Sequence, residues 1–307
     1  MKQNNKHAYC IICHNEPKLL SNLIAFLDNE RNDIFLMVDK KTDMGIYKGI
    51  RAHKAGMFFA ERIDVKWGDI SLIKAEYAVF ECARSHGVYS RYHLISGVDM
   101  PIKSQDYIHR FFDANPDVEC ISFSHEEQDE DDLRRKTSHY AFFLRHAKSR
   151  RKIVREMVFM INLISYRLYK TLHLKRTYPY TTLKKGTNWV SITNNLVEYL
   201  LSKKEEVLRN FNYILAADEI YKQTIVWNSS FRNKVYMPEN EYESCLRAID
   251  WQRGSPYCWG EDGITDVALL RTSKAIFARK FSSKNMWIVE EIKKIIKERG
   301  GERDESV

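Results

Sequence analysis

Two neighbouring carboxylates, Asp218 and Glu219, stand in the segment Leu215-Ala216-Ala217-Asp218-Glu219-Ile220, where the pattern predicts the start of a helix that runs through Val226. At a helix start, the backbone N–H groups and the helix dipole favour the ionised form of a carboxylate. An ionised carboxylate could serve as a general base that removes a proton from a hydroxyl group. Helix capping alone also accounts for Asp218, so the local pattern leaves both interpretations open.

Two adjacent cations, Arg279 and Lys280, lie between aromatic residues in Phe277-Ala278-Arg279-Lys280-Phe281. Lys and Arg side chains bind phosphate groups and can take the place of a metal cation. Positive charge of this kind stabilises a departing diphosphate, as in the transfer of a sugar from a nucleotide. Basic residues are also common on protein surfaces, so this pattern has an ordinary structural explanation as well.

The sequence offers little that would hold a metal ion. The segment Gly97-Val98-Asp99 carries one carboxylate, and the Asp-x-Asp pattern Asp129-Glu130-Asp131 lies in the hydrophilic run 125–132. The charge pattern predicts that this run is a solvated loop. Cys10 and Cys13 have the spacing of a zinc or redox pair, but they lie in an apolar segment and no second pair matches them. A site without a metal cofactor would need Lys or Arg in place of the cation.

An alternation of strands and helices over the first 125 residues would position these groups. Apolar runs predict strands at 8–13, 34–38, 56–59, 92–96 and 120–123, and helical spacing predicts one helix capped by Asn15 and another capped by Ser71. Such an alternation indicates an α/β fold with a mostly parallel central sheet flanked by helices. Asp39 and Asp99 both follow strands, at the edge where open α/β sheets bind ligands.

The stretch that follows differs from the first part in composition. At 156–176 a helix-like pattern of apolar residues is flanked by Lys and Arg. Two interpretations are open: an insertion helix that packs on the core, or an interfacial helix on an anionic membrane. Beyond this stretch the pattern predicts a strand at 189–193, a helix at 196–204 and a closing amphipathic helix at 287–297.

The bulk composition suits one large globular domain, with 307 residues of which 44% are hydrophobic and 29% charged. A formal net charge of +8 is compatible with nucleic acid, an anionic membrane or a phosphorylated small molecule. No zinc-finger spacing or RNP motif is present, which argues against nucleic acid. We see neither a signal peptide nor an apolar segment that could cross a bilayer, so we expect a cytoplasmic protein, at most peripheral at the inner membrane face.

A series of short segments, in one order, resembles the core-2/I-branching β-1,6-N-acetylglucosaminyltransferase and peptide O-xylosyltransferase family, in the form of a bacterial-type member. The segments fall roughly within residues 7–125 and 184–283. They are Ala8-Tyr9-Cys10-Ile11-Ile12-Cys13-His14, Met37-Val38-Asp39, Trp67-Gly68 with Ser71-Leu72, Leu94-Ile95-Ser96-Gly97-Val98-Asp99-Met100-Pro101-Ile102, Gly186-Thr187-Asn188-Trp189, Asp218-Glu219, Leu246-Arg247-Ala248-Ile249-Asp250-Trp251 and Phe277-Ala278-Arg279-Lys280-Phe281.

The resemblance implies a GT-A-type glycosyltransferase fold and an inverting reaction that needs no metal. By position, Glu219 takes the role of the general base and Lys280 binds the diphosphate. The implied uridine-binding positions are Cys13, His14 and Asp39. The positions implied for the donor and acceptor sugars are Trp67, Asp99, Gly186, Asn188, Trp189, Asp218, Trp251 and Arg253.

The chain also departs from the family pattern. Ala217 stands where the family commonly has Pro, and the basic residue that the branching enzymes place before the Lys has no clear match. Arg253 and Arg279 are the two candidates to replace it.

We therefore expect a single catalytic domain over residues 1–307. Its expected parts are a nucleotide-binding half at 7–125, a variable basic and helical insertion at 126–183, an acceptor-binding and catalytic half at 184–283, and a C-terminal helix and tail at 284–307. The expected reaction moves N-acetylglucosamine from a UDP-sugar to a glycan hydroxyl in a β-1,6 linkage, on an acceptor that a lipid could carry. UDP-xylose-dependent O-xylosyl transfer and non-catalytic binding of a nucleotide sugar are the alternatives.

Overall fold

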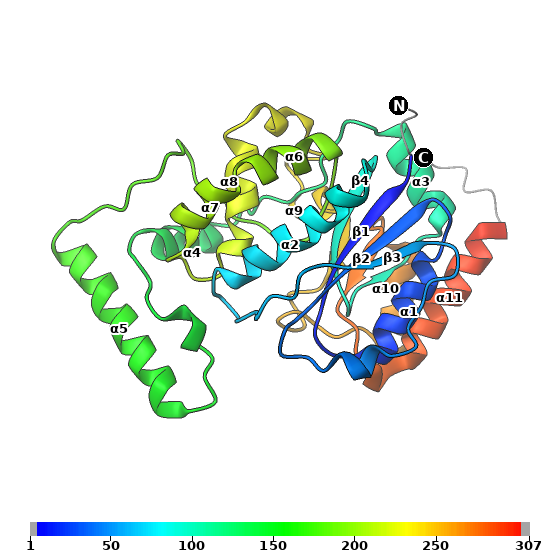
Figure 1. Cartoon of the computed structure of the whole chain (residues 1–307), viewed down its shortest axis with the longest axis horizontal. Coiled ribbons are helices and arrows are strands. Elements are labelled where there is room, and N and C mark those ends of the chain that lie inside the picture. The colour runs from blue at the N-terminus through cyan, green and yellow to red at the C-terminus, as the bar shows by residue number, and fades with distance from the viewer. Residues whose placement is uncertain (1–4, 302–307) are drawn as a thin grey trace.

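A five-stranded sheet forms the centre of the protein in the computed structural model, which describes residues 5–301 (Figure 1). The strand order is β3-β2-β1-β4-β6, with parallel pairing everywhere except between β4 and β6. A second sheet, in the order β5-β8-β7, pairs β8 antiparallel to β5 and parallel to β7. The strands are β1 (His7–Cys13), β2 (Asn32–Val38), β3 (Gly56–Phe59), β4 (Arg91–Ser96), β5 (Met100–Pro101), β6 (Val190–Ile192), β7 (Arg247–Ile249) and β8 (Phe277–Arg279).

Helices cover both faces of the central sheet, which confirms the predicted α/β fold with a mostly parallel sheet. The α-helices are α1 (Pro17–Leu27), α2 (Ser71–His86), α3 (Gln105–Ala114), α4 (Glu127–Thr137), α5 (Lys152–Thr171), α6 (Asn194–Ser202), α7 (Lys204–Phe211), α8 (Tyr221–Trp227), α9 (Glu241–Ser244), α10 (Gly263–Thr272) and α11 (Met286–Gly301). Short 3₁₀ turns lie at η1 (Met44–Tyr47), η2 (Leu144–His146), η3 (Ala217–Glu219), η4 (Ser230–Lys234) and η5 (Ser283–Asn285).

The central strand β1 divides the interior into two apolar cores. Ala8 and Cys10 point into a core shared with α2, α6, α7 and α8, whereas Tyr9, Ile11 and Cys13 point into one shared with α1, α3 and α11. Successive side chains of a strand face opposite sides of the sheet, so a strand covered on both faces must be apolar throughout. This requirement explains the continuous apolar run that predicts β1.

Three local predictions in the first part of the chain are wrong. Glu16, not Asn15, precedes α1 as its N-cap residue; it has a left-handed φ of 54° and makes no side-chain capping bond. Ser71 is the first residue of α2 rather than its cap, and its hydroxyl accepts a hydrogen bond from Lys66 N at 2.9 Å. The predicted strand at 120–123 is reduced to an isolated bridge between Cys120 and Ser191.

The acidic run at 125–132 is not the solvated loop that its charge pattern suggests, because most of it belongs to α4. The first turn of α4 carries three acidic residues and its last turn three basic ones, an arrangement that complements the helix dipole. Lys136 Nζ also lies 2.7 Å from Asp132 Oδ2, one helical turn away. Local charge pairing therefore makes a helix of a segment that contains almost no apolar residues.

Helix α5 stands away from the central sheet, at the end of the molecule opposite α11 (Figure 1). The helix expected at 156–176 begins four residues earlier than predicted, and of its side chains only Val158 and Ser165 are buried. None of its side chains belongs to either apolar core, so the interpretation as a helix packed on the core is wrong. Among residues 5–301, no helix combines the length and hydrophobicity that a membrane span requires.

Candidate active site

Three loops meet at the carboxyl edge of the central sheet, next to β1. From β1 the chain continues to β2 on one side of the sheet, while β4 lies on the other side of β1. The carboxyl end of β1, where the loops after β1, β2 and β4 lie together, is therefore the switch point of the sheet, and open α/β sheets bind ligands at such a point. Asp39 N donates to the carbonyl of Cys13 at 2.9 Å, and Gly97 N donates to that of Ile12 at 3.0 Å. A Cβ at Gly97 would lie 2.8 Å from the Cβ of Cys13, so the two loops touch directly.

The predicted uridine-binding residues lie at this switch point in different environments. His14 is exposed, whereas Cys13 is only 2% exposed. Burial raises the pKa of the Cys13 thiol to about 12, which keeps the thiol neutral near pH 7. The Cys13 side chain packs in the apolar core that contains α1.

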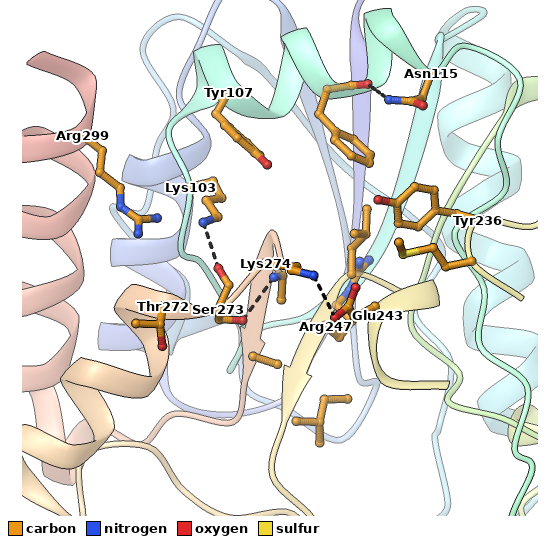
Figure 2. A pocket seen from close by; sticks show the side chains of 16 residues that line it. Lys103, Tyr107, Asn115, Tyr236, Glu243, Arg247, Thr272, Ser273, Lys274 and Arg299 are labelled. Atoms are coloured by element: carbon orange, nitrogen blue, oxygen red, sulfur yellow. Dashed lines mark hydrogen bonds and ion pairs between the residues drawn. The ribbon is translucent and has the colours of Figure 1, made fainter. Parts of the chain in front are cut away.

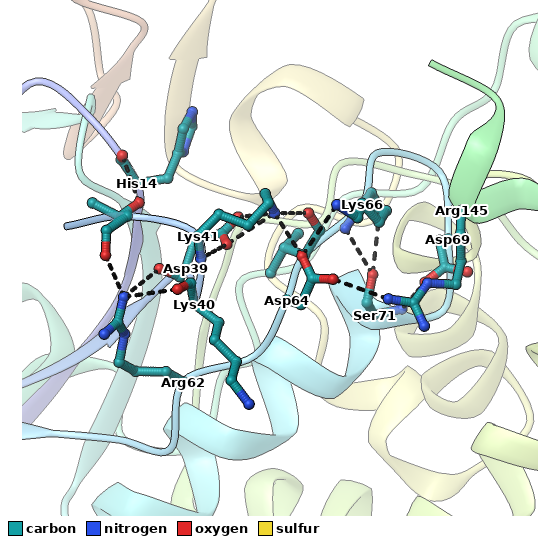
Figure 3. Close-up of polar contacts among 12 residues, drawn as sticks. His14, Asp39, Lys40, Lys41, Arg62, Asp64, Lys66, Asp69, Ser71 and Arg145 are labelled. Atoms are coloured by element: carbon teal, nitrogen blue, oxygen red, sulfur yellow. Dashed lines mark hydrogen bonds and ion pairs between the residues drawn. The ribbon is translucent and has the colours of Figure 1, made fainter. Parts of the chain in front are cut away.

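Asp39 belongs to a polar network that fixes the loop after β2 (Figure 3). Lys41 Nζ lies 2.7 Å from Asp39 Oδ2 and 3.1 Å from Asp64 Oδ1. Burial opposes the charged form of Lys41, but these two carboxylates outweigh it and raise the Lys41 pKa. Arg62 donates to the carbonyls of Asp39 and Lys40 at 3.0 and 3.1 Å. These contacts fix the loop and pair the charge of Asp39.

Asp99 is buried at the end of β4 and binds Arg279. Its carboxylate accepts hydrogen bonds from Ser96 N at 2.7 Å and from Ser96 Oγ at 2.9 Å, and Arg279 Nη1 lies 2.8 Å from Asp99 Oδ1. The Arg279 guanidinium also stacks over the ring of Trp189, 4.4 Å from its centroid. Arg279 therefore ties the switch point to the segment at 186–189.

Glu219 lies in the 3₁₀ turn η3, which the chain enters through Ala216 in a left-handed conformation (φ 54°). The predicted start of a long helix is wrong here, since α8 begins only at Tyr221. Gly186 N donates to the Glu219 carbonyl at 3.0 Å and so fixes the turn from the opposite side. A Cβ at Gly186 would lie 2.1 Å from Ser122 O, so only glycine allows this close approach.

The environment of Glu219 raises its pKa to about 7. Burial is the main cause, and the neighbouring carboxylate of Asp218 adds to it, while Lys136 and Lys185 act in the opposite direction. The Glu219 side chain is nevertheless 37% exposed, and Lys136 Nζ lies 3.9 Å from Glu219 Oε2. An accessible carboxylate with a pKa near neutrality is well suited to general-base catalysis.

Asp218 points inward from the same turn and is only 7% exposed. Asn188 Nδ2 donates to Asp218 Oδ2 at 3.2 Å, while Oδ1 has no hydrogen-bond partner among the described residues. Burial and the negative charge of Glu76 raise the Asp218 pKa to about 6. The nearby Lys222, itself buried against Glu76, partly offsets this effect. This oxygen is itself buried, and Asp218 does not line the cavity in front of Glu219, so its role in this geometry is to raise the Glu219 pKa.

A cavity of about 440 Å³ opens in front of Glu219. Trp251 contributes an aromatic side chain that is 49% exposed, and polar groups line the rest of the cavity. Lys185 lies in its wall and pairs with Asp129 at 2.6 Å. Aromatic faces and convergent polar groups are typical of small-molecule sites, and this cavity combines both next to the candidate base.

A larger cavity, of about 1060 Å³, contains none of the predicted site residues (Figure 2). It lies between α3, β7 and the loop after α10, and its charged groups bind their neighbours. Lys103 Nζ donates to Ser273 O at 2.9 Å, and Lys274 lies 3.4 Å from Glu243. The candidate site is therefore the smaller cavity at Glu219 together with the switch point.

Over residues 7–271 the sequence matches the family of Core-2/I-Branching enzymes. The chain belongs to this family. It is therefore a glycosyltransferase that uses a nucleotide-sugar donor and a glycan acceptor. A solved structure of mouse xyloside xylosyltransferase 1 in its apo form is similar, with 10% identity, a TM-score of 0.40 and coverage of 91% of this chain and 99% of that chain. The search of curated proteins returned no match.

The two basic residues considered as a second diphosphate ligand are both paired in this branching-enzyme family member. Arg253 lies 2.6 Å from Asp250, 3.3 Å from Asp262 and 2.9 Å from Asp266. Asp250 and Asp266 raise its pKa. Arg279 binds Asp99. Lys280 follows Arg279 and lies beside the switch point, because the next residue, Phe281, donates from its N–H to Val98 O at 2.9 Å. Lys280 forms no ion pair within residues 5–301.

Trp67 lies at the rim of the site and is 51% exposed. Lys148 Nζ stacks over its ring, 3.6 Å from the centroid, so the insertion contacts a predicted sugar-binding residue. Gly68 O accepts a hydrogen bond from Ala216 N at 3.1 Å, which joins the Trp67 loop to the turn that carries Glu219. The structure thus places Trp67 beside the same turn as the candidate base.

Two cations near Glu219, Lys136 and Lys185, are not among the residues predicted from the sequence. Lys136 lies within the predicted insertion, and Lys185 lies at the start of the predicted catalytic half, directly before Gly186. The spacing of Asp132 and Lys136 on one helix face would have been a usable signal, once α4 was recognised as a helix. Nothing local indicates that Lys185 reaches Asp129 and Asp132, at 2.6 and 3.0 Å.

Proposed function

We propose that this enzyme catalyses an inverting, metal-independent transfer of a sugar from a UDP-sugar to a glycan hydroxyl, with Glu219 as the general base. The observation that carries the proposal is the placement of Glu219, an accessible carboxylate with a pKa raised to about 7, at the wall of the 440 Å³ cavity. An acceptor sugar in this cavity would stack on Trp251 and direct a hydroxyl toward the base.

The proposed reaction is a single displacement. Glu219 takes the proton of the acceptor hydroxyl while the hydroxyl oxygen forms a bond with the anomeric carbon. The bond between that carbon and the UDP oxygen breaks on the opposite face, so the configuration inverts and UDP leaves with its electron pair. Lys280 stabilises the negative charge that develops on the diphosphate.

Metal independence is supported by the way the carboxylates around the site are already bound. Asp99 pairs with Arg279, Asp39 with Lys41, and Asp129 with Lys185. Within residues 5–301, no group of three or more His, Cys, Asp or Glu side chains is arranged to hold a metal ion. In this proposal, Lys280 supplies the positive charge that stabilises the departing diphosphate.

UDP release in the presence of excess EDTA tests this proposal. The donors would be UDP-N-acetylglucosamine, UDP-xylose, UDP-glucose and UDP-galactose, with simple glycosides as acceptors. We expect turnover to survive EDTA, with UDP-N-acetylglucosamine preferred and a β-1,6 linkage in the product. Turnover that returns only when Mn²⁺ is restored would contradict the metal-free mechanism, and preference for UDP-xylose would replace the proposed donor. We propose a lipid-linked glycan as the natural acceptor, for which the glycosides are soluble substitutes.

The pH dependence of the reaction should respond to Lys136. Because the base must be deprotonated, kcat/KM should rise with pH through the Glu219 pKa of about 7. Lys136 lowers that pKa, so Lys136→Met should raise it and shift the acidic limb of the profile to higher pH. The measurement is kcat/KM for UDP release across the pH range, with the distant surface variant Lys293→Met as the control. An unshifted limb in Lys136→Met would show that another group controls the profile.

A further inference from the structure

Helix α5 carries an exposed apolar stripe that no part of the described chain covers. Ile153, Met157, Met160, Ile164 and Leu168 recur at intervals of three or four residues, and each is at least half exposed, from 50% at Met160 to 69% at Ile153. This spacing places all five on one face of a helix. A contiguous apolar surface of this kind marks an interaction site far more often than isolated exposed side chains do.

The stripe is held in place by contacts on the neighbouring face of α5. Asn162 pairs with the backbone of Phe142, accepting from its N–H at 2.7 Å and donating to its carbonyl at 3.0 Å. Ser165 Oγ donates to Tyr140 O at 2.8 Å. An apolar groove of about 310 Å³ between Phe142 and α5 then extends the stripe toward the body of the protein. The helix is attached through these hydrogen bonds and through the ring contacts of Tyr166 with His139 and of Tyr169 with Tyr140, and it leaves its apolar face outward.

The charge of this segment favours an anionic partner. Residues 145–176 contain ten Lys and Arg and one Glu, a net charge of +9, whereas the whole chain carries +8. All of the excess positive charge thus lies on and beside α5, and the remainder of the chain has a net charge of −1. An apolar stripe bordered by cations is the pattern of a helix that lies in the headgroup region of an anionic bilayer. Two copies of this face would repel each other, which disfavours a dimer through α5.

We propose that α5 docks the enzyme on the surface of an anionic lipid bilayer, with Ile153, Met157, Met160, Ile164 and Leu168 entering the boundary between headgroups and acyl chains. Docking requires no nucleotide and no acceptor. The surface is therefore independent of the role proposed for Glu219.

The segment before α5 also connects the docking surface to the active site. Arg145 Nη2 lies 3.0 Å from Asp64 Oδ2, in the network that fixes the loop after β2 (Figure 3). Lys148 stacks on Trp67 at the rim of the site. Docking would consequently hold the Trp67 rim near the lipid headgroups. This orientation, which rests on the proposed function, suits an acceptor glycan that is linked to a lipid.

Co-sedimentation of the full chain with vesicles tests the docking. Vesicles of phosphatidylcholine with added phosphatidylglycerol should bind the protein at low salt, and vesicles of phosphatidylcholine alone should bind it at least about tenfold more weakly. High salt should weaken the binding to the anionic vesicles. Equal binding to both compositions, or no binding to either, would overturn the proposal.

Two sets of exposed substitutions separate the apolar and the charged contributions. The triple variant Met157→Ser, Met160→Ser, Ile164→Ser should lose at least about tenfold in vesicle affinity because less apolar surface enters the bilayer. The variant Arg151→Gln, Arg155→Gln, Lys170→Gln should lose about 100-fold, at roughly fivefold for each charge near the surface. Ile264→Ser, at a position that is 87% exposed on α10, is the matched control and should bind like the wild type.

The unfolding temperature and the UDP release of the α5 variants, measured without vesicles, show whether they are folded and active. We expect both to remain at wild-type values, because the substituted side chains are exposed and lie outside both cores. Wild-type vesicle binding by the Met157, Met160 and Ile164 variant would overturn the proposal. A concentration-dependent dimer in light scattering that this variant abolishes, without vesicle binding by the wild type, would assign the surface to a second copy instead.

Discussion

Glu219→Gln is expected to lower the turnover number by about 100-fold to 10,000-fold while UDP affinity stays near the wild-type value. Glutamine has nearly the shape of glutamate but cannot accept the proton of the acceptor hydroxyl. The turn itself should persist, because the hydrogen bond from Gly186 reaches the backbone carbonyl of residue 219 rather than its side chain. The measurements are kcat for UDP release and the calorimetric Kd for UDP.

A matched control for this substitution lies in the same cavity. Glu126 is an exposed carboxylate in the wall of the cavity, so Glu126→Gln removes the same charge from nearby without removing the proposed base. We expect its turnover to remain within a few-fold of the wild type. If Glu219→Gln behaved like Glu126→Gln, the role of Glu219 as the base would be refuted.

Glu219→Gln should also stabilise the folded state slightly at neutral and higher pH. The pKa of Glu219 rises from 4.5 to about 7, so the folded state binds this proton more tightly than the unfolded state does. The free energy of folding that depends on protonated Glu219 is fully present below pH 4.5. It is lost as the pH rises from 4.5 to about 7 and the carboxyl group ionises in the folded protein. A neutral Gln avoids that loss, and the partial exposure of the side chain keeps the effect small. A thermal unfolding scan above pH 7 should therefore give an equal or higher Tm for the variant.

Lys280→Ala is expected to reduce turnover by about 100-fold to 1000-fold, the usual effect of losing one charge-stabilising group. Lys280 lies beside the switch point and forms no ion pair within residues 5–301. Arg279 is bound to Asp99 and stacked on Trp189, and Arg253 is held by three carboxylates. Loss of Lys280 should act mainly on kcat, because negative charge builds on the diphosphate as the donor bond breaks.

Kinetics of UDP release with varied donor check this prediction, and two further variants sharpen it. Lys280→Arg keeps the positive charge and should recover part of the lost rate. Lys284→Ala removes an exposed lysine four residues away and should leave turnover unchanged. Wild-type kcat in Lys280→Ala would move the diphosphate-binding role to another cation, and Arg279 would be the next residue to test.

The central strand β1 was predictable from sequence because it is buried on both faces and its residues 8–13 are apolar without interruption. The candidate base could be located only through the family resemblance. Its local pattern suggested an ordinary helix cap, whereas the structure has a 3₁₀ turn entered through the left-handed Ala216. That conformation depends on contacts with Gly68 and Gly186, which are distant in sequence and invisible to a local pattern.

The charged groups were the hardest part to predict, because their partners come from other elements. Arg253 looked available for a phosphate, but Asp266 reaches it from α10, thirteen residues further along the chain. Asp129 looked solvated, yet Lys185 reaches it across the wall of the cavity. The positive charge of residues 145–176 can be read from the sequence. Only the structure shows that the apolar face of α5 is turned outward.

The position of α5 outside both cores makes it a separable module. Its side chains contribute nothing to the packing around β1, and the segment before it contacts the catalytic body through surface groups such as Arg145 and Lys148 and through ring contacts such as that of Tyr140 with Tyr213. Surface contacts of this kind can change at little cost to folding, whereas substitutions in either core cannot. Evolution, or a protein engineer, could therefore exchange this helix and redirect the enzyme to another surface while the transfer chemistry stays intact.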